Sequence, residues 1–165
     1  MKISRFLAIM LPLLAFTSGV FSVSAATVDP MKLPKLTQYV EDFSNVLSQT
    51  DLESLRQAAR EYEKKTTVQV VVVLFPTREG NELFDIGMRI FKDNAIGQKG
   101  KDNGILLVIA TDEKKIRIIT GYGLEGDIPD VLASDMIEKD IRPLVNEAKY
   151  TEAIRAFFAR VDRAV

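Results

Sequence analysis

The chain has 165 residues and a formal net charge of −1 at pH 7, and it contains neither cysteine nor histidine. The near-balance of 22 basic and 23 acidic side chains argues against binding to nucleic acid, which requires clustered lysine and arginine. Without cysteine and histidine, Ser-His-Asp and Cys-His hydrolases are excluded, and the usual ligands of zinc and copper are missing.

The first 26 residues have the pattern of a secretory signal peptide. Lys2 and Arg5 form a short basic region, and an apolar run follows over Phe6–Phe16. This run is shorter than the about 20 residues that a membrane span needs. Ser24-Ala25-Ala26 is a cleavage site of the small-x-small kind. We expect a protein cleaved after Ala26, or else after Ala25, and exported to the periplasm or another extracytoplasmic space; the alternative is an uncleaved N-terminal anchor.

The chain that remains after cleavage is long enough for one compact domain. Removing residues 1–26 takes away two positive charges, which leaves 139 residues with a formal charge of −3. Residues 27–35, which include Pro30 and Pro34, predict an extended lead-in, and residues 36–165 predict the domain. No second apolar stretch of spanning length follows, so we expect the mature domain not to insert into lipid.

The first half of this domain predicts a helix, a strand and a second helix. Residues 39–47 predict a loop or a short extended segment. Ser48 predicts the N-cap of the first helix, because apolar residues on either side of it take the positions of a hydrophobic staple. The run Gln69–Phe75 is rich in β-branched residues and predicts a strand buried on both faces. Residues 81–93 predict the second helix, because their apolar residues recur at helical spacing.

The second half predicts a hairpin and two more helices. Ile105–Ala110 predicts another buried strand, and strand, helix and strand in this order form a right-handed βαβ unit with parallel strands. After a charged turn, Lys115–Thr120 returns antiparallel. We expect a helix over residues 130–141 that is interrupted by Pro143, and a last helix capped by Thr151. The predicted fold class is α/β: a three-layer α/β/α sandwich around a small mixed β-sheet, with one βαβ unit and a β-hairpin.

Two glycine-rich loops carry the side chains of the candidate site. Residues 97–104 lead into the first strand of the hairpin, and residues 121–126 follow its second strand. Because the strands of a hairpin are antiparallel, the two loops must lie close together. Oxygen ligands on such loops suit a hard cation such as Ca²⁺ or Mg²⁺. The oxygen-bearing side chains in question are Asp102, Asn103, Glu125, Asp127 and Asp130.

Two structural interpretations of these residues stay open beside the cation site. In one, Asp127 caps the following helix, with Asp130 at its N3 position. In the other, Asp102-Asn103-Gly104 is a turn whose side chains bond the backbone. Residues 121–126 also match G-x-G-x-x-G, but they follow an antiparallel strand outside the βαβ unit, which argues against dinucleotide binding.

The order of these motifs along the chain resembles the TPM-domain family. This family includes exported bacterial proteins and thylakoid-lumen proteins linked to photosystem II repair. The resemblance implies an α/β/α sandwich, which agrees with the fold expected from the residues, and it covers about residues 36–162. The motifs that carry it are Asp42-x-x-x-x-Leu47-Ser48, Ile96-Gly97, Asp102-Asn103-Gly104-Ile105-Leu106-Leu107, Arg117-Ile118, Gly121-Tyr122-Gly123-Leu124-Glu125-Gly126 and Asp130.

The resemblance also implies an acidic groove that binds divalent cations, Ca²⁺ in particular. Arg117 matches a basic position, which either pairs with the acidic cluster or faces a phosphate. The positions that match the metal-binding residues of the family are Asp42, Asp102, Asn103, Glu125 and Asp130.

We therefore expect an exported Ca²⁺-binding module, with Mg²⁺ as a second candidate ion, that supports the maintenance or assembly of membrane-protein complexes. The alternative is a metal-dependent phosphatase acting on phosphate monoesters, because some plant members of the family are described as acid phosphatases. Without histidine or cysteine, phosphoryl transfer would need an aspartate nucleophile or a metal-activated water. Asp102 and Asp130 are the candidate catalytic residues for that reaction.

Overall fold

The computed structural model describes residues 29–165, so the predicted signal peptide over residues 1–26 lies outside the described residues. A four-stranded sheet in the order β1-β2-β3-β4 forms the middle of the molecule. Its first three strands are parallel and the fourth is antiparallel to its neighbour. The strands are β1 (Val40–Asp42), β2 (Gln69–Phe75), β3 (Gly104–Ala110) and β4 (Lys115–Thr120).

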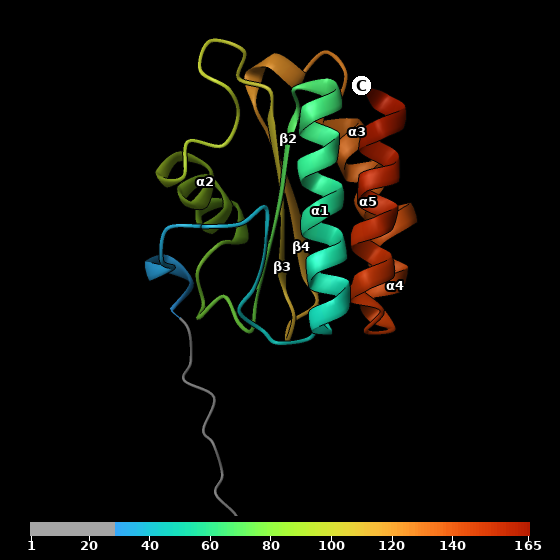
Figure 1. Ribbon diagram of the computed structural model, residues 1–165. Coiled ribbons are helices and arrows are strands. Elements are labelled where there is room, and N and C mark those ends of the chain that lie inside the picture. The colour runs from blue at the N-terminus through green and yellow to red at the C-terminus, as the bar shows by residue number, and fades with distance from the viewer. Residues whose placement is uncertain (1–28) are drawn as a thin grey trace, which may run out of the picture.

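Helices cover both faces of the sheet, which confirms the predicted α/β/α sandwich (Figure 1). Helices α1 (Gln49–Thr66) and α5 (Tyr150–Ala164) lie side by side on one face, and α2 (Leu83–Asp93) lies on the other. Because β2, α2 and β3 follow one another and the strands are parallel, the predicted βαβ unit is present. The predicted hairpin is formed by β3 and β4.

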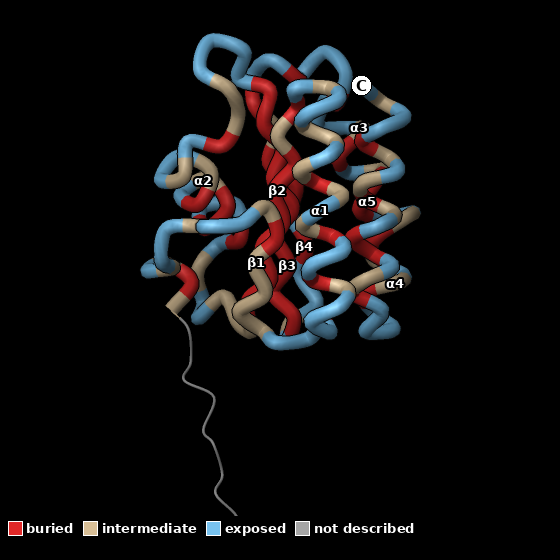
Figure 2. Tube along the Cα trace, viewed as in Figure 1, coloured by how far each residue is buried: buried red, intermediate tan, exposed pale blue. Residues whose placement is uncertain are grey.

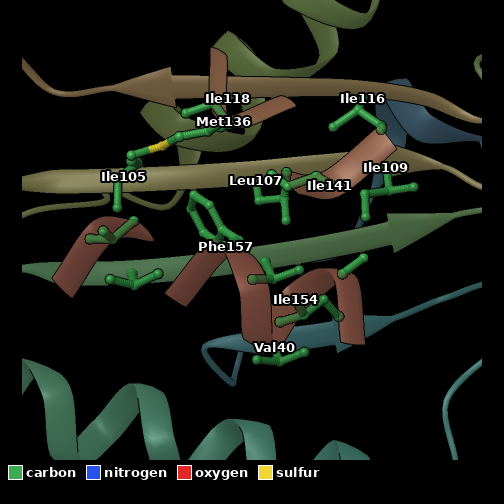
Figure 3. Packing of buried hydrophobic residues seen from close by; sticks show 14 of the residues in the cluster. Val40, Ile105, Leu107, Ile109, Ile116, Ile118, Met136, Ile141, Ile154 and Phe157 are labelled. Carbon is green, nitrogen blue, oxygen red and sulfur yellow. The ribbon is translucent and has the colours of Figure 1, made fainter. Parts of the chain in front are cut away.

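The core lies on both faces of β2 and β3 and is drawn as the central red band in Figure 2. All seven residues of β3 are buried, because helices shield both of its faces from water. Alternate residues therefore face different helices. Figure 3 shows Ile105, Leu107 and Ile109 on the face that also carries Ile154 and Phe157 of α5.

The sheet has one more strand than the sequence predicted. β1 forms within residues 39–47, where we expected a loop or a short extended segment, and it pairs in parallel with β2. The connections β1-α1-β2 and β2-α2-β3 advance across the sheet in the same direction, but their helices lie on opposite faces. The two crossovers consequently have opposite hands, so only one of them follows the right-handed rule.

The structure corrects the predicted lead-in over residues 27–35. Its residues Pro30–Lys32 form a short 3-10 helix, η1, and are not extended. Asp29 caps this turn, because its Oδ1 accepts a hydrogen bond from the backbone N–H of Met31 at 2.9 Å. Apolar side chains of the lead-in then pack against the α2 face of the core, and the backbone N–H of Leu36 donates to Oδ1 of Asn94 at 2.8 Å.

The predicted N-cap of α1 is confirmed, since Oγ of Ser48 accepts a hydrogen bond from the backbone N–H of Asp51 at 3.0 Å. Helix α2 begins at Leu83, two residues after the predicted start at residue 81.

The C-terminal helices differ from the prediction at two points. Pro143 does not interrupt the chain's helical path: the π-helical residues 136–141 run directly into a helix that begins at Arg142 and contains Pro143 at its start. Thr151 is not a cap, since α5 begins one residue earlier and Lys149 is its N-cap. Between β4 and α5 the chain forms four short helical elements: the 3-10 helix η2 (Tyr122–Leu124), α3 (Asp130–Asp135), the π-helix η3 (Met136–Ile141) and α4 (Arg142–Asn146). Within residues 29–165, none of the helices is both long enough and apolar enough to span a bilayer.

Candidate functional site

The two glycine-rich loops meet at one end of the sheet, where β3 begins and β4 ends. We call this region, formed by residues 97–103 and 121–130, the glycine end. The backbone N–H of Gly121 donates to the carbonyl of Gly104 at 2.8 Å, and the N–H of Gly123 donates to the carbonyl of Asp102 at 3.1 Å. These two bonds confirm the predicted closeness of the loops.

Glycine is needed in the second loop because the two backbones approach closely. A Cβ atom on Gly121 would lie 2.2 Å from the carbonyl oxygen of Asp102, and one on Gly123 would lie 1.9 Å from that of Lys101. Neither glycine has a positive φ, so conformational freedom is not the reason for its presence. The close approach fixes the two loops against each other through main-chain atoms.

Asn103 is buried and holds the first loop to the start of β2. Its Nδ2 donates to the carbonyl of Thr67 at 2.7 Å, and its Oδ1 accepts from the backbone N–H of Gln98 at 2.9 Å. For Asn103, the geometry therefore supports the interpretation as a turn residue whose side chain bonds the backbone. The amide oxygen that we expected to bind a cation already serves the loop.

The carboxylates of the glycine end are in a different situation. Asp102, Glu125 and Asp130 are exposed, and within residues 29–165 no hydrogen bond or ion pair engages their side chains. Asp127 is also exposed and does not cap α3, because Pro129 is the N-cap and Asp130 is already the first helical residue. The prediction of an Asp127 cap is wrong, and these carboxylates stay free to bind a ligand.

The structure does not bring Asp42 to this group. It is the last residue of β1, in register with Leu74 and through that residue with Ile109 of β3. Ile109 lies five residues beyond the start of β3, which corresponds to roughly 17 Å along the strand. We call this opposite edge, where β1, β2 and β3 end, the carboxyl end.

Several polar groups at the carboxyl end are hydrogen-bonded within the protein. The carboxylate of Asp42 accepts from the backbone N–H of Ser44 at 3.1 Å and of Leu47 at 2.8 Å. Thr111 donates its hydroxyl proton to Oγ of Ser44 at 2.9 Å, and the hydroxyl of Tyr150 donates to the carbonyl of Thr111 at 3.2 Å. Burial, with a smaller contribution from the Asp112 carboxylate, raises the pKa of Tyr150.

Arg117 contacts neither the carboxylates of the glycine end nor those of the carboxyl end. It pairs with Val108 in the middle of the hairpin, and its guanidinium lies 5.0 Å from the ring centre of Phe84 on α2. This is the geometry of a cation–π contact. It therefore neither pairs with the acidic cluster nor faces a site at the glycine end.

The glycine end offers carboxylate oxygens that could ligate a hydrated cation, but these oxygens do not surround a single point. In the part of the chain that the structure describes, no three histidine, cysteine or acidic side chains converge in a way that could hold a metal ion. A divalent cation here would keep several water molecules and contact one or two carboxylates, as Mg²⁺ and weakly bound Ca²⁺ do. For phosphoryl transfer, no described side chain orients the carboxylate of Asp102 or Asp130 as a nucleophile.

Comparison with known proteins places this geometry in a family. The model of the TPM domain matches residues 40–164. The fold is similar to an N-terminal domain from P. gingivalis, with a TM-score of 0.75, 27% identity and coverage of 84% of this chain and 92% of that one. It is also similar to the BA42 protein of Bizionia argentinensis, with a TM-score of 0.64, 18% identity and coverage of 73% and 82%.

A third solved structure shares the fold at lower identity. The N-terminal domain of the cg2496 protein of Corynebacterium glutamicum has a TM-score of 0.60 and 14% identity, with coverage of 79% of this chain and 82% of that one. None of the curated proteins compared with the chain matches it.

Proposed function

Because this chain belongs to the TPM domain family, we propose that it is an exported module that binds a divalent cation, Ca²⁺ or Mg²⁺, at its glycine end. The observation that carries the proposal is the bond between the N–H of Gly123 and the carbonyl of Asp102, at 3.1 Å. It holds Asp102 next to the turn that carries Glu125. Each of these residues presents an exposed carboxylate, and the described part of the chain provides no partner for either.

The chemistry of the chain favours a hard cation over a soft one. It has no histidine or cysteine, so every strong side-chain ligand is an oxygen atom. Uncompensated carboxylates that lie near one another repel, and a divalent cation removes this repulsion. Because the ligands are few and exposed, we expect weak binding, with a Kd of about 10⁻⁴–10⁻³ M as in extracellular calcium modules.

Such affinity suits a protein outside the cytoplasm. We propose that the loaded glycine end contacts membrane-protein complexes and supports their maintenance or assembly. The rigid backbone contact between the loops supports this role, since it presents a bound ion on a surface that need not reorganise on contact.

The test is a titration of the mature chain with CaCl₂ and then MgCl₂, followed by backbone amide NMR. We expect shifts at residues 102–104 and 121–130 that saturate at millimolar ion, and none around Asp42. Asp102→Asn removes one charge-assisted contact and should weaken binding about tenfold. Asp112→Asn is the matched control, because Asp112 is also exposed but lies at the carboxyl end. Shifts centred on Asp42, or none at 10 mM ion (about tenfold above the weakest expected Kd), would overturn the proposal.

An enzyme assay separates cation binding from phosphoryl transfer. The proposal expects that p-nitrophenyl phosphate with Mg²⁺ or Ca²⁺ is turned over no faster by this protein than by an Asp102→Asn, Asp130→Asn double variant. Metal-dependent turnover that the double variant loses would assign phosphatase activity to the same carboxylates.

A further inference from the structure

The two edges of the sheet differ in whether their outward backbone groups are occupied. At the β1 edge, Tyr39 and Phe43 bond to β2, so the backbone groups of Val40 between them point away from the sheet. The carbonyl of Val40 accepts a hydrogen bond from Nε of Arg56 at 2.9 Å, and Val40 is fully buried. The β4 edge lies at the other end of the strand order, where β4 pairs with β3 alone.

Alternate residues of β4 direct their backbone N–H and C=O groups away from β3. The N–H of Gly121 donates to the carbonyl of Gly104 at 2.8 Å, and bonded pairs alternate with non-bonded pairs along an antiparallel ladder. In the register of the hairpin, the residues with outward groups are therefore Ile116, Ile118 and Thr120. Within residues 29–165, no backbone or side-chain group forms a hydrogen bond with these outward groups. They form a template on which a further strand can pair.

The exposed side chains along this edge are basic. Lys115 and Arg117 are exposed, and neither forms an ion pair with a carboxylate of residues 29–165. Both side chains lie on the face of the sheet that α2 covers, because Ile119 has the same parity and belongs to the core on that face. There the ring of Phe84, which is 48% exposed, lies 5.0 Å from the guanidinium of Arg117.

This pattern of charge decides which strand the edge accepts. Basic side chains on an edge strand prevent pairing with strands that bring no compensating charge. A second copy of β4 would bring Lys115 and Arg117 close to the same residues of the first copy, which is unfavourable. A strand with glutamate or aspartate at alternate positions would instead place its carboxylates beside both basic groups, because residues i and i+2 of a strand share a face.

We propose that the free edge of β4 binds an extended, acidic segment of a partner protein, which extends the four-stranded sheet by one strand. Main-chain hydrogen bonds to the outward groups of β4 supply affinity, as in other complexes formed by strand addition. Carboxylates at alternate positions of the segment pair with Lys115 and Arg117 and supply specificity. The exposed ring of Phe84 covers the segment on the α2 face.

Four peptides of the same length test the charge preference and the strand geometry. The probe is acetyl-Thr-Val-Glu-Val-Glu-Val-Thr-amide. In two of the others glutamine or lysine replaces both glutamates, and in the last proline replaces the central valine. Each is titrated into the metal-free protein, and backbone amide shifts are followed by NMR.

We expect the glutamate peptide to shift residues 115–121 and the neighbouring part of α2 at millimolar concentration. The glutamine peptide should bind about tenfold more weakly, because it lacks both charge-assisted contacts. The lysine and proline peptides should not bind, since one repels the basic groups and the other lacks a central N–H donor. The glutamate peptide should also slow hydrogen exchange at Ile116, Ile118 and Thr120.

Variants identify the groups responsible. Lys115→Glu combined with Arg117→Glu should reverse the preference, so that the lysine peptide binds and the glutamate peptide does not. Lys99→Glu combined with Lys101→Glu is the matched control, because it changes the net charge equally at two exposed lysines outside β4. Thr120→Pro removes one outward N–H and should weaken binding about fivefold, whereas Thr120→Val keeps this donor and should not. Melting temperatures of all variants show that binding is not lost through unfolding.

Equal or tighter binding of the glutamine or lysine peptide, shifts centred away from β4, or no shifts with any peptide would overturn the proposal. It would also fail if the control double variant reversed the preference. Sedimentation of the free protein tests the other occupant, since a dimer that Thr120→Pro dissociates would assign the edge to a second copy of this chain. Because the titrations contain no divalent cation, these outcomes do not depend on the cation site.

Discussion

The two ends of the sheet use acidic side chains in opposite ways. At the glycine end, Asp102 and Glu125 are exposed and the described residues offer them no partner. At the carboxyl end, Asp42 accepts two backbone hydrogen bonds, and Glu113 accepts from the hydroxyl of Thr77 at 2.9 Å and from Nε of Arg78 at 3.2 Å.

The difference follows from how each set of loops is held. At the glycine end, main-chain contacts through Gly121 and Gly123, together with the Asn103 amide, fix the loops. The carboxylates there are not needed for structure. At the carboxyl end, the carboxylates of Asp42 and Glu113 themselves hold the loops in place, so these two are committed. Carboxylates are thus free for a ligand where the backbone and neutral side chains have already satisfied the loop.

The largest expected effect comes from breaking the backbone contact at the glycine end. Gly123→Ala would place a Cβ atom 1.9 Å from the carbonyl oxygen of Lys101, so the loops must separate. We expect the free energy of unfolding to fall by about 3 kcal/mol. Gly126→Ala is the matched control, because nothing lies within 4 Å of its Cβ position. Urea unfolding measures both, and similar losses for the two variants would show that the close approach is not needed.

The second prediction separates neighbouring residues of the glycine end. Asn103→Ala leaves the carbonyl of Thr67 and the N–H of Gln98 without these partners in a partly buried place. The expected loss of stability is about 2 kcal/mol. Asp102→Asn should change the free energy of unfolding by less than about 0.5 kcal/mol, because the Asp102 side chain is exposed and forms no hydrogen bond or ion pair with residues 29–165. Chemical denaturation tests the pair, and a larger loss for Asp102→Asn would reverse our assignment of the two roles.

The hairpin, the βαβ unit and the closeness of the two loops could be predicted from the sequence because their signals are local. A fully apolar run such as Ile105–Ala110 indicates a strand covered on both faces, and an antiparallel return places its flanking loops together. β1 has no such signal, since three residues are too few to show periodicity. Its parallel pairing depends on packing across the whole sheet, and this pairing places Asp42 at the carboxyl end.

The roles of individual site residues depended on burial that no sequence pattern reports. Asp102 and Asn103 are neighbours with similar propensities, but only Asn103 faces into the protein. Local rules therefore assign the elements, whereas the satisfaction of each polar group requires the three-dimensional arrangement.

The third prediction concerns the structural role of a carboxylate at the carboxyl end. Asp42→Ala removes the acceptor of the backbone N–H groups of Ser44 and Leu47, and we expect a loss of about 1.5 kcal/mol. Asp42→Asn keeps one acceptor oxygen and should lose less. Neither change should alter the Ca²⁺-induced amide shifts at the glycine end. If an Asp42 variant kept the free energy of unfolding of the unmodified protein but bound Ca²⁺ more weakly, Asp42 would belong to the cation site.

The smallest effect is a weakening of the carboxyl end at alkaline pH. Burial and the Asp112 carboxylate raise the pKa of Tyr150, whose hydroxyl donates to the carbonyl of Thr111. The folded state therefore holds this proton more tightly than the unfolded state, so the stabilisation is complete below the ordinary tyrosine pKa of about 10 and is lost as the pH rises through the raised value. Urea unfolding between about pH 8 and pH 11 should show this fall, and Tyr150→Phe should reduce its slope. Tyr122→Phe, at a side chain that is 79% exposed, is the control. If both variants leave the slope unchanged, the hydroxyl of Tyr150 does not contribute to this end of the sheet.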